Sequence, residues 1–367
     1  MTERLKDLFF SDDFIKELGR AIAGVYPEFD QAEFHRLIHS DDWESKELKQ
    51  KMHHVTQSLV ATLPKDYAQA LKILLDVAPL FQGFNALIFP DYVESKGLDD
   101  WDLSLPALAF FTSLCSSEFA IRPFLAKDPD RAMKFISKWA EDEDYHLRRL
   151  ASEGCRPRLP WAMSLPEFKK DPAPVLQILE ILKEDPVEYV RKSVANNLND
   201  ISKDHPDVVL DICESWYGNS VNTNWIVKRA CRTLLKQGNQ RALVLFGFGD
   251  PGQIEVESFR FDRQNLPIGD ELGFTFEMKP GTSEVRRIRL EYAVDYVKAR
   301  GKISRKIFQI KEADFGAGSY TITKKHSFRD LSTRKHYPGK HQFTLIINGQ
   351  EKAVGLIELV QAKNIRQ

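Results

Sequence analysis

The sequence predicts a mainly α protein in two parts, an α-solenoid followed by a small β-sandwich. Three observations predict this class. Apolar residues recur through residues 1–245 at positions i, i+3, i+4 and i+7, which share one face of a helix. Segments within that stretch resemble one another at offsets of 44 and 36 residues. From residue 254 onward the apolar spacing changes to two, the period of β-strands. A chain of 367 residues is long enough for two such domains.

The helical part consists of short helices. Segments such as "YAQALKILLDVAPLF" and "PVLQILEILKED" place their apolar residues on one face, and Asp-Pro or His-Pro pairs begin several of them. Proline suits the first turn of a helix because the N–H that it lacks would be unpaired there.

An internal repeat indicates how these helices are arranged. The aligned segments are "YHLRRLASEG" from residue 145, "YVRKSVANNL" from residue 189 and "WIVKRACRTL" from residue 225. Each begins with an aromatic residue, and the sixth positions are apolar: Leu150, Val194 and Ala230. The offsets bracket the period of two-helix HEAT-like units, so we expect a HEAT-like α-solenoid. The alignment also sets Glu153 opposite Asn197, with Asp200 three residues further on, which predicts two acids on neighbouring helix ends.

Glycine and proline end the helical pattern in "FGFGDPGQ", and residues 246–253 are expected to be a linker. No GxGxxG follows a strand there, which argues against a nucleotide loop. Residues 254–367 contain six or seven strand-like segments, with "NGQ" at 348–350 as a hairpin turn. Strands of this number and length are typical of a β-sandwich.

Charge is unevenly distributed along the chain. The formal net charge is −1, yet residues 260–345 contain 18 Lys and Arg against 10 Asp and Glu, a net +8 that leaves −9 elsewhere. This asymmetry fits an anion-binding module on an acidic body, and it equally fits an ordinary solvated surface.

Cysteine usage and hydropathy point to a cytoplasmic protein. No CxxC pair occurs, and no signal-like or membrane-length apolar segment is present. We expect free thiols at all four cysteines, which are Cys115, Cys155, Cys213 and Cys231.

The sequence contains few of the motifs that are typical of metal sites or of phosphate-binding loops. His35 and His39 share a helix face in "HRLIH", but the glutamate of HExxH is missing, which favours a surface helix. Three further histidines lie among basic residues that would repel a divalent ion: His326, His336 and His341. No GxSxG elbow, Walker motif or acidic cluster with metal-ligand spacing is present, so a metal-dependent nuclease is disfavoured and no metal is expected.

The remaining candidates are acidic and aromatic, and each has a purely structural alternative. Glu153 is a possible solvated helix-end acid, Asp200 a helix cap, and Trp161, after the constrained "RPRLP" loop, a loop anchor.

The runs "LRRLASEGCRPRLPW", "EYVRKSVANNLNDISKDHP" and "SSEFAIRPFL" resemble the AlkC branch of the HEAT-like-repeat DNA glycosylases, and the resemblance extends over the whole chain. It implies an immunoglobulin-like C-terminal domain and hydrolytic excision of 3-methyladenine and 3-methylcytosine from double-stranded DNA, without a deep base pocket and without cofactor or metal. The active-site residues that it implies are Glu118, Glu153, Trp161 and Asp200. The tryptophans that surround an aspartate in the related AlkD branch are not found here, so the AlkD lesion preference is not carried over.

Such an enzyme would need cations to hold DNA phosphates, and we expect it to act as a monomer. The loop arginines are the first choice, and the β-region cations are the second, because strand alternation alone exposes many charges. The candidates are Arg148, Arg149, Arg156, Arg158, Arg286, Arg287, Arg289, Lys324, Lys325, Arg334 and Lys335. The alternative is a noncatalytic HEAT-type scaffold that binds protein or DNA.

Overall fold

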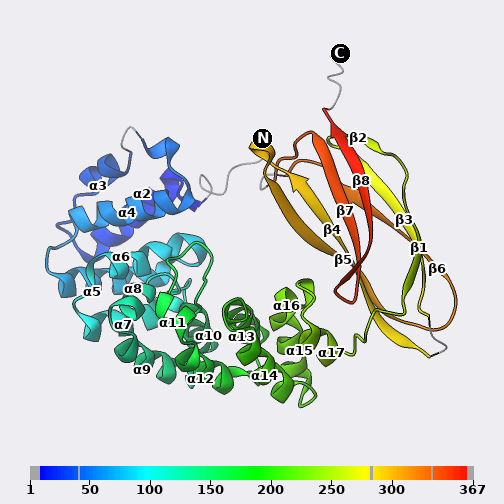
Figure 1. Ribbon diagram of the computed structural model, residues 1–367. Coiled ribbons are helices and arrows are strands. Elements are labelled where there is room, and N and C mark those ends of the chain that lie inside the picture. Colours follow the sequence, from blue (N-terminus) through cyan, green and yellow to red (C-terminus); the bar gives the residue numbers. More distant parts are fainter. Residues whose placement is uncertain (1–8, 40–41, 282–283, 332–333, 362–367) are drawn as a thin grey trace. The chain divides into compact units, whose positions relative to one another are not determined.

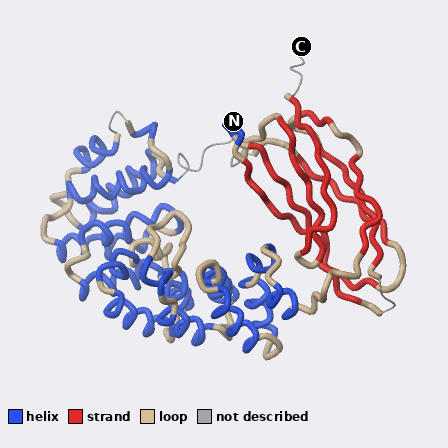
Figure 2. Tube along the Cα trace, viewed as in Figure 1, coloured by secondary structure: helices blue, strands red, loops and turns tan. Residues whose placement is uncertain are grey.

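The computed structural model describes residues 9–39, 42–281, 284–331 and 334–361, and these form two compact units. The first unit contains the described residues up to Val209 together with Ser215–Ala230. The second contains Leu210–Glu214 and the described residues from Cys231 onward. Helices fill the first unit and strands dominate the second, as the sequence predicts (Figure 1, Figure 2).

The helices of the described residues are short and follow one another closely in sequence. They are α2 (Asp12–Val25), α3 (Gln31–Ile38), α4 (Leu48–Thr62), α5 (Tyr67–Val77), α6 (Ile88–Lys96), α7 (Trp101–Thr112), α8 (Arg122–Lys127), α9 (Pro129–Ala140), α10 (Tyr145–Gly154), α11 (Pro166–Lys170), α12 (Ala173–Leu182), α13 (Glu188–Ile201), α14 (Pro206–Trp216), α15 (Val221–Ala230), α16 (Arg232–Lys236) and α17 (Gln240–Leu245). Short 3₁₀ turns are η1 (Trp43–Ser45), η2 (Ala78–Leu80), η3 (Gly83–Leu87) and η4 (Ala299–Gly301).

Aspartate starts many of these helices. Its side chain accepts a hydrogen bond from a backbone N–H of the first turn, which would otherwise lack a partner. Asp66 does so for Gln69 at 2.9 Å, and Asp128 for Arg131 at 3.0 Å. Asp128 precedes Pro129, the first residue of α9, so the Asp-Pro pair supplies both the cap and the first helical residue.

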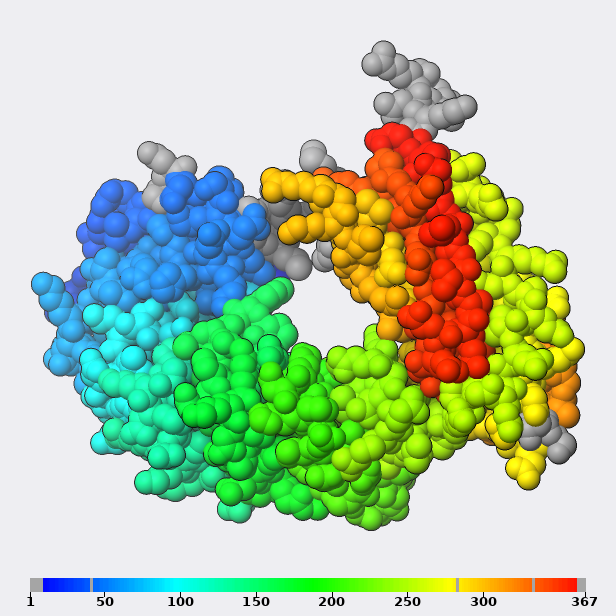
Figure 3. All heavy atoms as spheres, viewed as in Figure 1, coloured from blue at the N-terminus to red at the C-terminus, as the bar shows by residue number. Residues whose placement is uncertain are grey.

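The three aligned repeat segments fold as neighbouring helices. The helix α10 packs on α13, and α13 packs on α15. The aligned residues Leu150, Val194 and Ala230 are all fully buried. The sequence alignment therefore identified equivalent positions. The surface of the helical unit runs in chain order from blue to green (Figure 3).

The second unit is built on two sheets. The smaller has strand order β1-β3-β6 and the larger β2-β8-β7-β4-β5. All pairs are antiparallel except β2 with β8. The strands are β1 (Glu255–Phe261), β2 (Asn265–Pro267), β3 (Glu271–Lys279), β4 (Arg286–Val297), β5 (Ile303–Phe315), β6 (Tyr320–Ser327), β7 (Gly339–Ile347) and β8 (Gln350–Val360).

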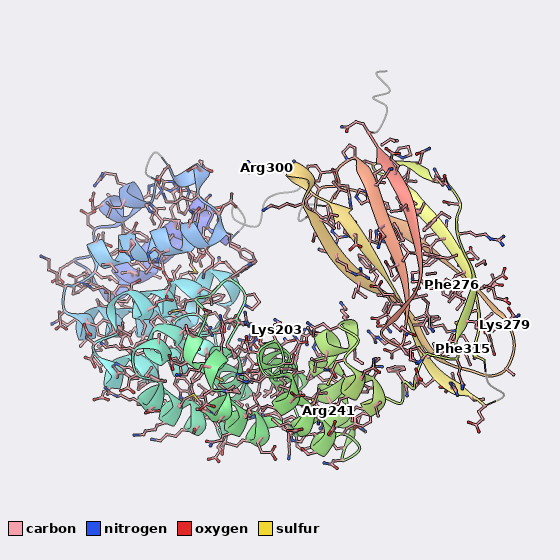
Figure 4. The ribbon with its side chains drawn as sticks, viewed as in Figure 1. Lys203, Arg241, Phe276, Lys279, Arg300 and Phe315 are labelled. Carbon is pink, nitrogen blue, oxygen red and sulfur yellow. The ribbon has the colours of Figure 1, made fainter. Side chains whose placement is uncertain are left out.

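The sandwich core is rich in aromatic residues. Phe274, Phe276 and Tyr292 are buried in it, and Figure 4 labels Phe276 and Phe315 in this unit. Strand β2 was not predicted from the sequence because three residues ending in Pro267 show no alternation. The predicted hairpin is present, since Asn348 and Gly349 have φ of 45° and 78° and join β7 to β8.

Two helices and the expected linker also belong to the second unit. A Cβ on Gly238, just after α16, would lie 2.8 Å from the carbonyl oxygen of Gly349, so backbone meets backbone there. Asn348 donates a hydrogen bond to the carbonyl of Gly249 at 2.9 Å, and Phe248 is buried. Residues 246–253 are thus packed against the sandwich. Among the described residues, none of the helices has the length and apolar composition needed to cross a membrane.

Candidate active site

The C-terminal end of α10 lies against the middle of α13, and polar side chains join them. Asn197 Nδ2 donates to the carbonyl of Ser152 at 2.7 Å. Ser193 Oγ donates to Glu153 Oε2 at 2.6 Å. All four residues are buried, so these bonds fix the Glu153 carboxylate relative to α13.

Arg156 links the two predicted acids. Its Nη1 lies 2.5 Å from Glu153 Oε1, and its Nε and Nη2 lie 2.9 and 2.8 Å from Asp200 Oδ2. The side chains of Arg156 and Asp200 are 8% and 4% exposed. Burial lowers the pKa of the Arg156 guanidinium, but the charges of Glu153 and Asp200 outweigh it and raise that pKa overall. The arginine therefore stays charged and joins both carboxylates.

Glu118 joins the same network from the segment before α8. Arg149 contacts Glu118 Oε2 directly and lies 3.6 Å from Glu153 Oε1. The Arg149 guanidinium also stacks 4.9 Å from the ring centre of Tyr189. With Lys203 Nζ 3.0 Å from Asp200 Oδ1, three carboxylates face three cations. Figure 4 labels Lys203, which follows α13.

The loop after α10 is held by one fully buried arginine, Arg122 of α8. Its Nη1 donates to the carbonyls of Gly154 and Arg156 at 2.8 and 2.9 Å, and its Nε donates to that of Met163 at 2.7 Å. Burial lowers the pKa of Arg122 to about 10, so it remains charged at neutral pH. A single guanidinium thereby fixes both ends of residues 154–163.

Trp161 projects from this loop. Its side chain is 71% exposed, and its φ of 62° is in the left-handed region that non-glycine residues seldom adopt. Lys49 Nζ of α4 donates to the Trp161 carbonyl at 2.8 Å while lying 4.1 Å from the ring centre of Phe119. The loop therefore holds an unfavourable backbone conformation that leaves the indole free to meet a ligand.

A pocket of about 640 Å³ lies beside these residues. Glu118, Glu153, Arg156 and Trp161 line it, and Asp200 does not, although it lies behind Arg156. The rest of the lining mixes apolar and aromatic side chains with polar ones, and it consists of Gly83, Phe84, Leu87, Ser113, Leu114, Cys115, Ser116, Phe119, His146, Arg149, Leu159, Pro160 and Tyr189. A ligand in this pocket would meet the exposed indole of Trp161 and the carboxyl groups of Glu118 and Glu153.

Comparisons with known proteins agree with this picture. The family described as "DNA alkylation repair enzyme" matches residues 114–234, and the one described as "Uncharacterised protein YhaZ, C-terminal Ig-like domain" matches residues 255–361. YhaZ of Bacillus subtilis (strain 168) is 45% identical over 349 residues, which are 95% of this chain and 97% of YhaZ. The structure of Pseudomonas fluorescens alkylpurine DNA glycosylase AlkC, bound to DNA containing an abasic site analog, is 39% identical with a TM-score of 0.92. That match covers 98% of this chain and 100% of AlkC. The chain belongs to the AlkC family of DNA alkylation repair proteins.

The expected AlkC resemblance and the immunoglobulin-like domain are thus confirmed. The four arginines around the site, in contrast, form ion pairs with acidic side chains that the sequence did not indicate. Arg149 and Arg156 are buried against acids in this AlkC-family chain. Arg148 pairs with Asp185 at 2.6 Å and donates to backbone carbonyls, with its side chain 15% exposed. Only Arg158 of the four has a more exposed side chain, and it pairs with Asp204 at 2.6 Å.

The cationic side chains of the β-region differ in their exposure to solvent. Arg289 is buried and contacts Glu291 and Glu312, so it is not available to phosphate as the sequence suggested. Arg334 is half-buried and stacks on Tyr296. Arg286 is half-buried and donates to Gln253, and Lys324 is also half-buried. The exposed members of the group are Arg287, Lys325 and Lys335.

Sequence reasoning missed several residues around the site of this AlkC-family protein. Ser193 lies on the α13 face that meets α10, and Tyr189 lies one turn before it. Asn197, which the alignment had set opposite Glu153, lies on the same face, but its hydrogen bond to the Ser152 carbonyl was not foreseen. The repeat alignment had already set α13 against α10, so a polar residue on that helix face was the available signal. Lys49 and Arg122 carried no such signal, because each acts on a loop far along the chain.

Proposed function

We propose that this protein is a monofunctional DNA glycosylase that excises cationic N-alkylated bases from double-stranded DNA. The observation that carries the proposal is the pair of buried acidic side chains, Glu153 and Asp200, joined by Arg156 beside an exposed tryptophan. The overall likeness to the alkylpurine DNA glycosylase AlkC supports it. The finer parts of the proposal are a HEAT-like solenoid, a cytoplasmic monomer, and 3-methyladenine and 3-methylcytosine as the bases removed.

Alkylation at N3 gives the base a positive charge and weakens its bond to the sugar. When the C1′–N bond breaks, the bonding electron pair leaves with the base and neutralises it, while positive charge moves to the sugar. A fixed carboxylate in a site with little water stabilises that charge more strongly than it could in solvent. Water then adds to C1′ and loses a proton to a carboxylate or to solvent. The base needs no protonation by the enzyme.

Each residue has a proposed part in this reaction. Glu153 and Asp200 supply the negative charge, and Arg149 and Arg156 hold the two carboxyl groups in position. Trp161 offers its face to the cationic base, an interaction worth about 0.5–2 kcal/mol. Glu118 lies further along the network and is a supporting acid. Arg158 and the exposed cations of the sandwich are the proposed phosphate contacts.

The test is incubation of the purified protein with methylated duplex DNA in EDTA, followed by separation of released bases. We expect free 3-methyladenine and an abasic site, without strand cleavage. DNA binding with no released base would favour the noncatalytic scaffold. Strand cleavage that requires added metal would instead point to a nuclease.

A further inference from the structure

Two histidines and an aspartate meet at the N-terminal end of the helical unit. Asp12 begins α2, His35 lies in α3, and His39 directly follows α3. Asp12 Oδ1 lies 2.7 Å from His35 Nε2 and 3.2 Å from His39 Nε2. One ligand atom from each residue lies within 4.8 Å of the other two. Among the described residues this is the group of three that has metal-ligand geometry.

The two histidine side chains stand next to each other at the C-terminal end of α3. The two rings lie 4.2 Å apart between centres, as expected for positions i and i+4 on one helix face.

The surroundings hold these ligands without filling the site. Lys16 Nζ lies 2.5 Å from the other carboxylate oxygen, Oδ2, and so leaves Oδ1 directed at the histidines. The ring of His39 packs edge-on against Trp43, which limits its rotation. The charge of Glu44 also acts on His39 and adds to the negative potential there. Lys16 is the opposing charge that an ion would have to overcome.

We propose that Asp12, His35 and His39 bind one Zn²⁺ ion, which fastens the start of α2 to the end of α3. Two imidazoles and one carboxylate are ligands that Zn²⁺ accepts, with water as the fourth. In tetrahedral Zn²⁺ coordination, ligand atoms about 2.0 Å from the metal lie roughly 3.3 Å apart. The observed separations of 2.7 and 3.2 Å need only small side-chain shifts to admit the ion.

This site is independent of the proposed excision chemistry, which needs no metal. It also differs from the HExxH arrangement considered from the sequence. The third ligand, Asp12, lies in a different helix, 23 residues before His35. No local sequence motif therefore contains all three ligands.

The test is calorimetric titration of the EDTA-treated, dialysed full chain with ZnCl₂. We expect binding that weakens more than about tenfold in His35→Gln, His39→Gln and Asp12→Asn, since even outer partners of a metal cost at least tenfold. The matched control is His53→Gln, because His53 also pairs with an aspartate, Asp91, at 3.1 Å but has no second histidine. Its affinity should equal that of the unsubstituted chain.

A second measurement separates binding from folding. Zn²⁺ should raise the thermal unfolding midpoint of the unsubstituted chain and of His53→Gln, because an ion bound only by the folded state stabilises it. It should raise the midpoint of His35→Gln much less. Because the His35 side chain is partly exposed, we expect this substitution to change the metal-free midpoint little. No Zn²⁺ binding by the unsubstituted chain, or equal affinity in all four variants, would overturn the proposal.

Discussion

Charged side chains make up most of the site, and substitution of Glu153 or Asp200 is the most direct test of its proposed role. We predict that Glu153→Gln and Asp200→Asn each lower single-turnover excision of 3-methyladenine by about 10²–10³, because shape is kept while the anion is lost. Both acids face buried arginines, so each substitution should also lower stability. Excision should therefore be measured where circular dichroism shows every variant folded. Glu167→Gln, an exposed acid of α11, is the control, and unchanged excision in both site variants would refute their role.

Arg156 is a positioning residue whose two functions can be separated. Arg156→Met should cost about 3–5 kcal/mol of stability, because it leaves buried carboxylates without their partner. Arg156→Lys keeps the positive charge but has a single ammonium group, which cannot bond both acids as the guanidinium does. Compared with Arg156→Met, it should therefore restore stability more fully than it restores the excision rate. Urea unfolding and single-turnover rates give the two quantities. The comparison is Arg158→Met, whose more exposed ion pair with Asp204 should be worth about 1 kcal/mol or less.

At the scale of helices, Gly154 sets how closely α10 approaches the segment before α8. A Cβ there would lie 2.7 Å from Ile121 Cγ2, so alanine forces the two apart. We predict that Gly154→Ala destabilises the protein and slows excision, although alanine is the better helix former. Gly24→Ala in α2 is the control, because no described atom lies within 4 Å of its added Cβ. That variant should gain about 0.5–1 kcal/mol in urea unfolding.

The helices α4 and α6 enclose a carboxyl group that should titrate near neutrality. Burial and then the charge of Asp91 raise the pKa of Glu94 to about 7, while Lys49 and His53 act in the opposite direction. The folded state therefore binds this proton more tightly than the unfolded state, whose pKa is 4.5. Stability from this group is greatest below pH 4.5 and declines as the pH rises to 7.

Glu94→Gln removes this dependence. We predict that its urea midpoint exceeds that of the unsubstituted chain above pH 7 and approaches it near pH 4.5. The exposed Glu28→Gln serves as the reference substitution. A Glu94→Gln difference that stays constant with pH would show that the carboxyl does not titrate in this range.

The periodicity of apolar residues and of the internal repeat allowed the sequence to predict the helices and some of their neighbours. Helical spacing identified the helices, and the repeat placed α10 beside α13 and so brought Glu153 near Asp200. Charge alone could not reveal that Arg149 and Arg156 are buried, since arginine is usually a surface residue. The contact of Lys49 with Trp161 joins a helix to a distant loop, and that of Asp12 with His35 joins two helices, so no local pattern encodes them.

For the whole molecule, the open question is whether the sandwich takes part in binding DNA. Removing it is a poor test, because α16 and α17 belong to the same compact unit and would be left without their partner. We predict instead that reversing the exposed cations Arg287, Lys325 and Lys335 to Glu in the full chain weakens DNA binding. The slope of log affinity against log salt should become shallower by about 0.9 for each DNA phosphate that the protein no longer neutralises.

The control reverses three exposed lysines of the helical unit, Lys65, Lys72 and Lys170, which changes net charge equally. A larger effect of the sandwich variants would assign them direct contacts. An identical change in affinity and salt slope for both triple variants would leave only a net-charge effect.

The Arg122 clamp also bears on how this site could be inherited. Arg122 and the three carbonyls that it holds all fall within residues 114–234, the stretch that the DNA alkylation repair family shares. The same stretch contains both main acids, their arginines and Trp161. A recombination event that moved this stretch would carry the loop together with the residue that shapes it. The helices before it would have to supply again what Lys49 and the pocket residues Gly83, Phe84 and Leu87 supply here, since these lie outside the shared stretch.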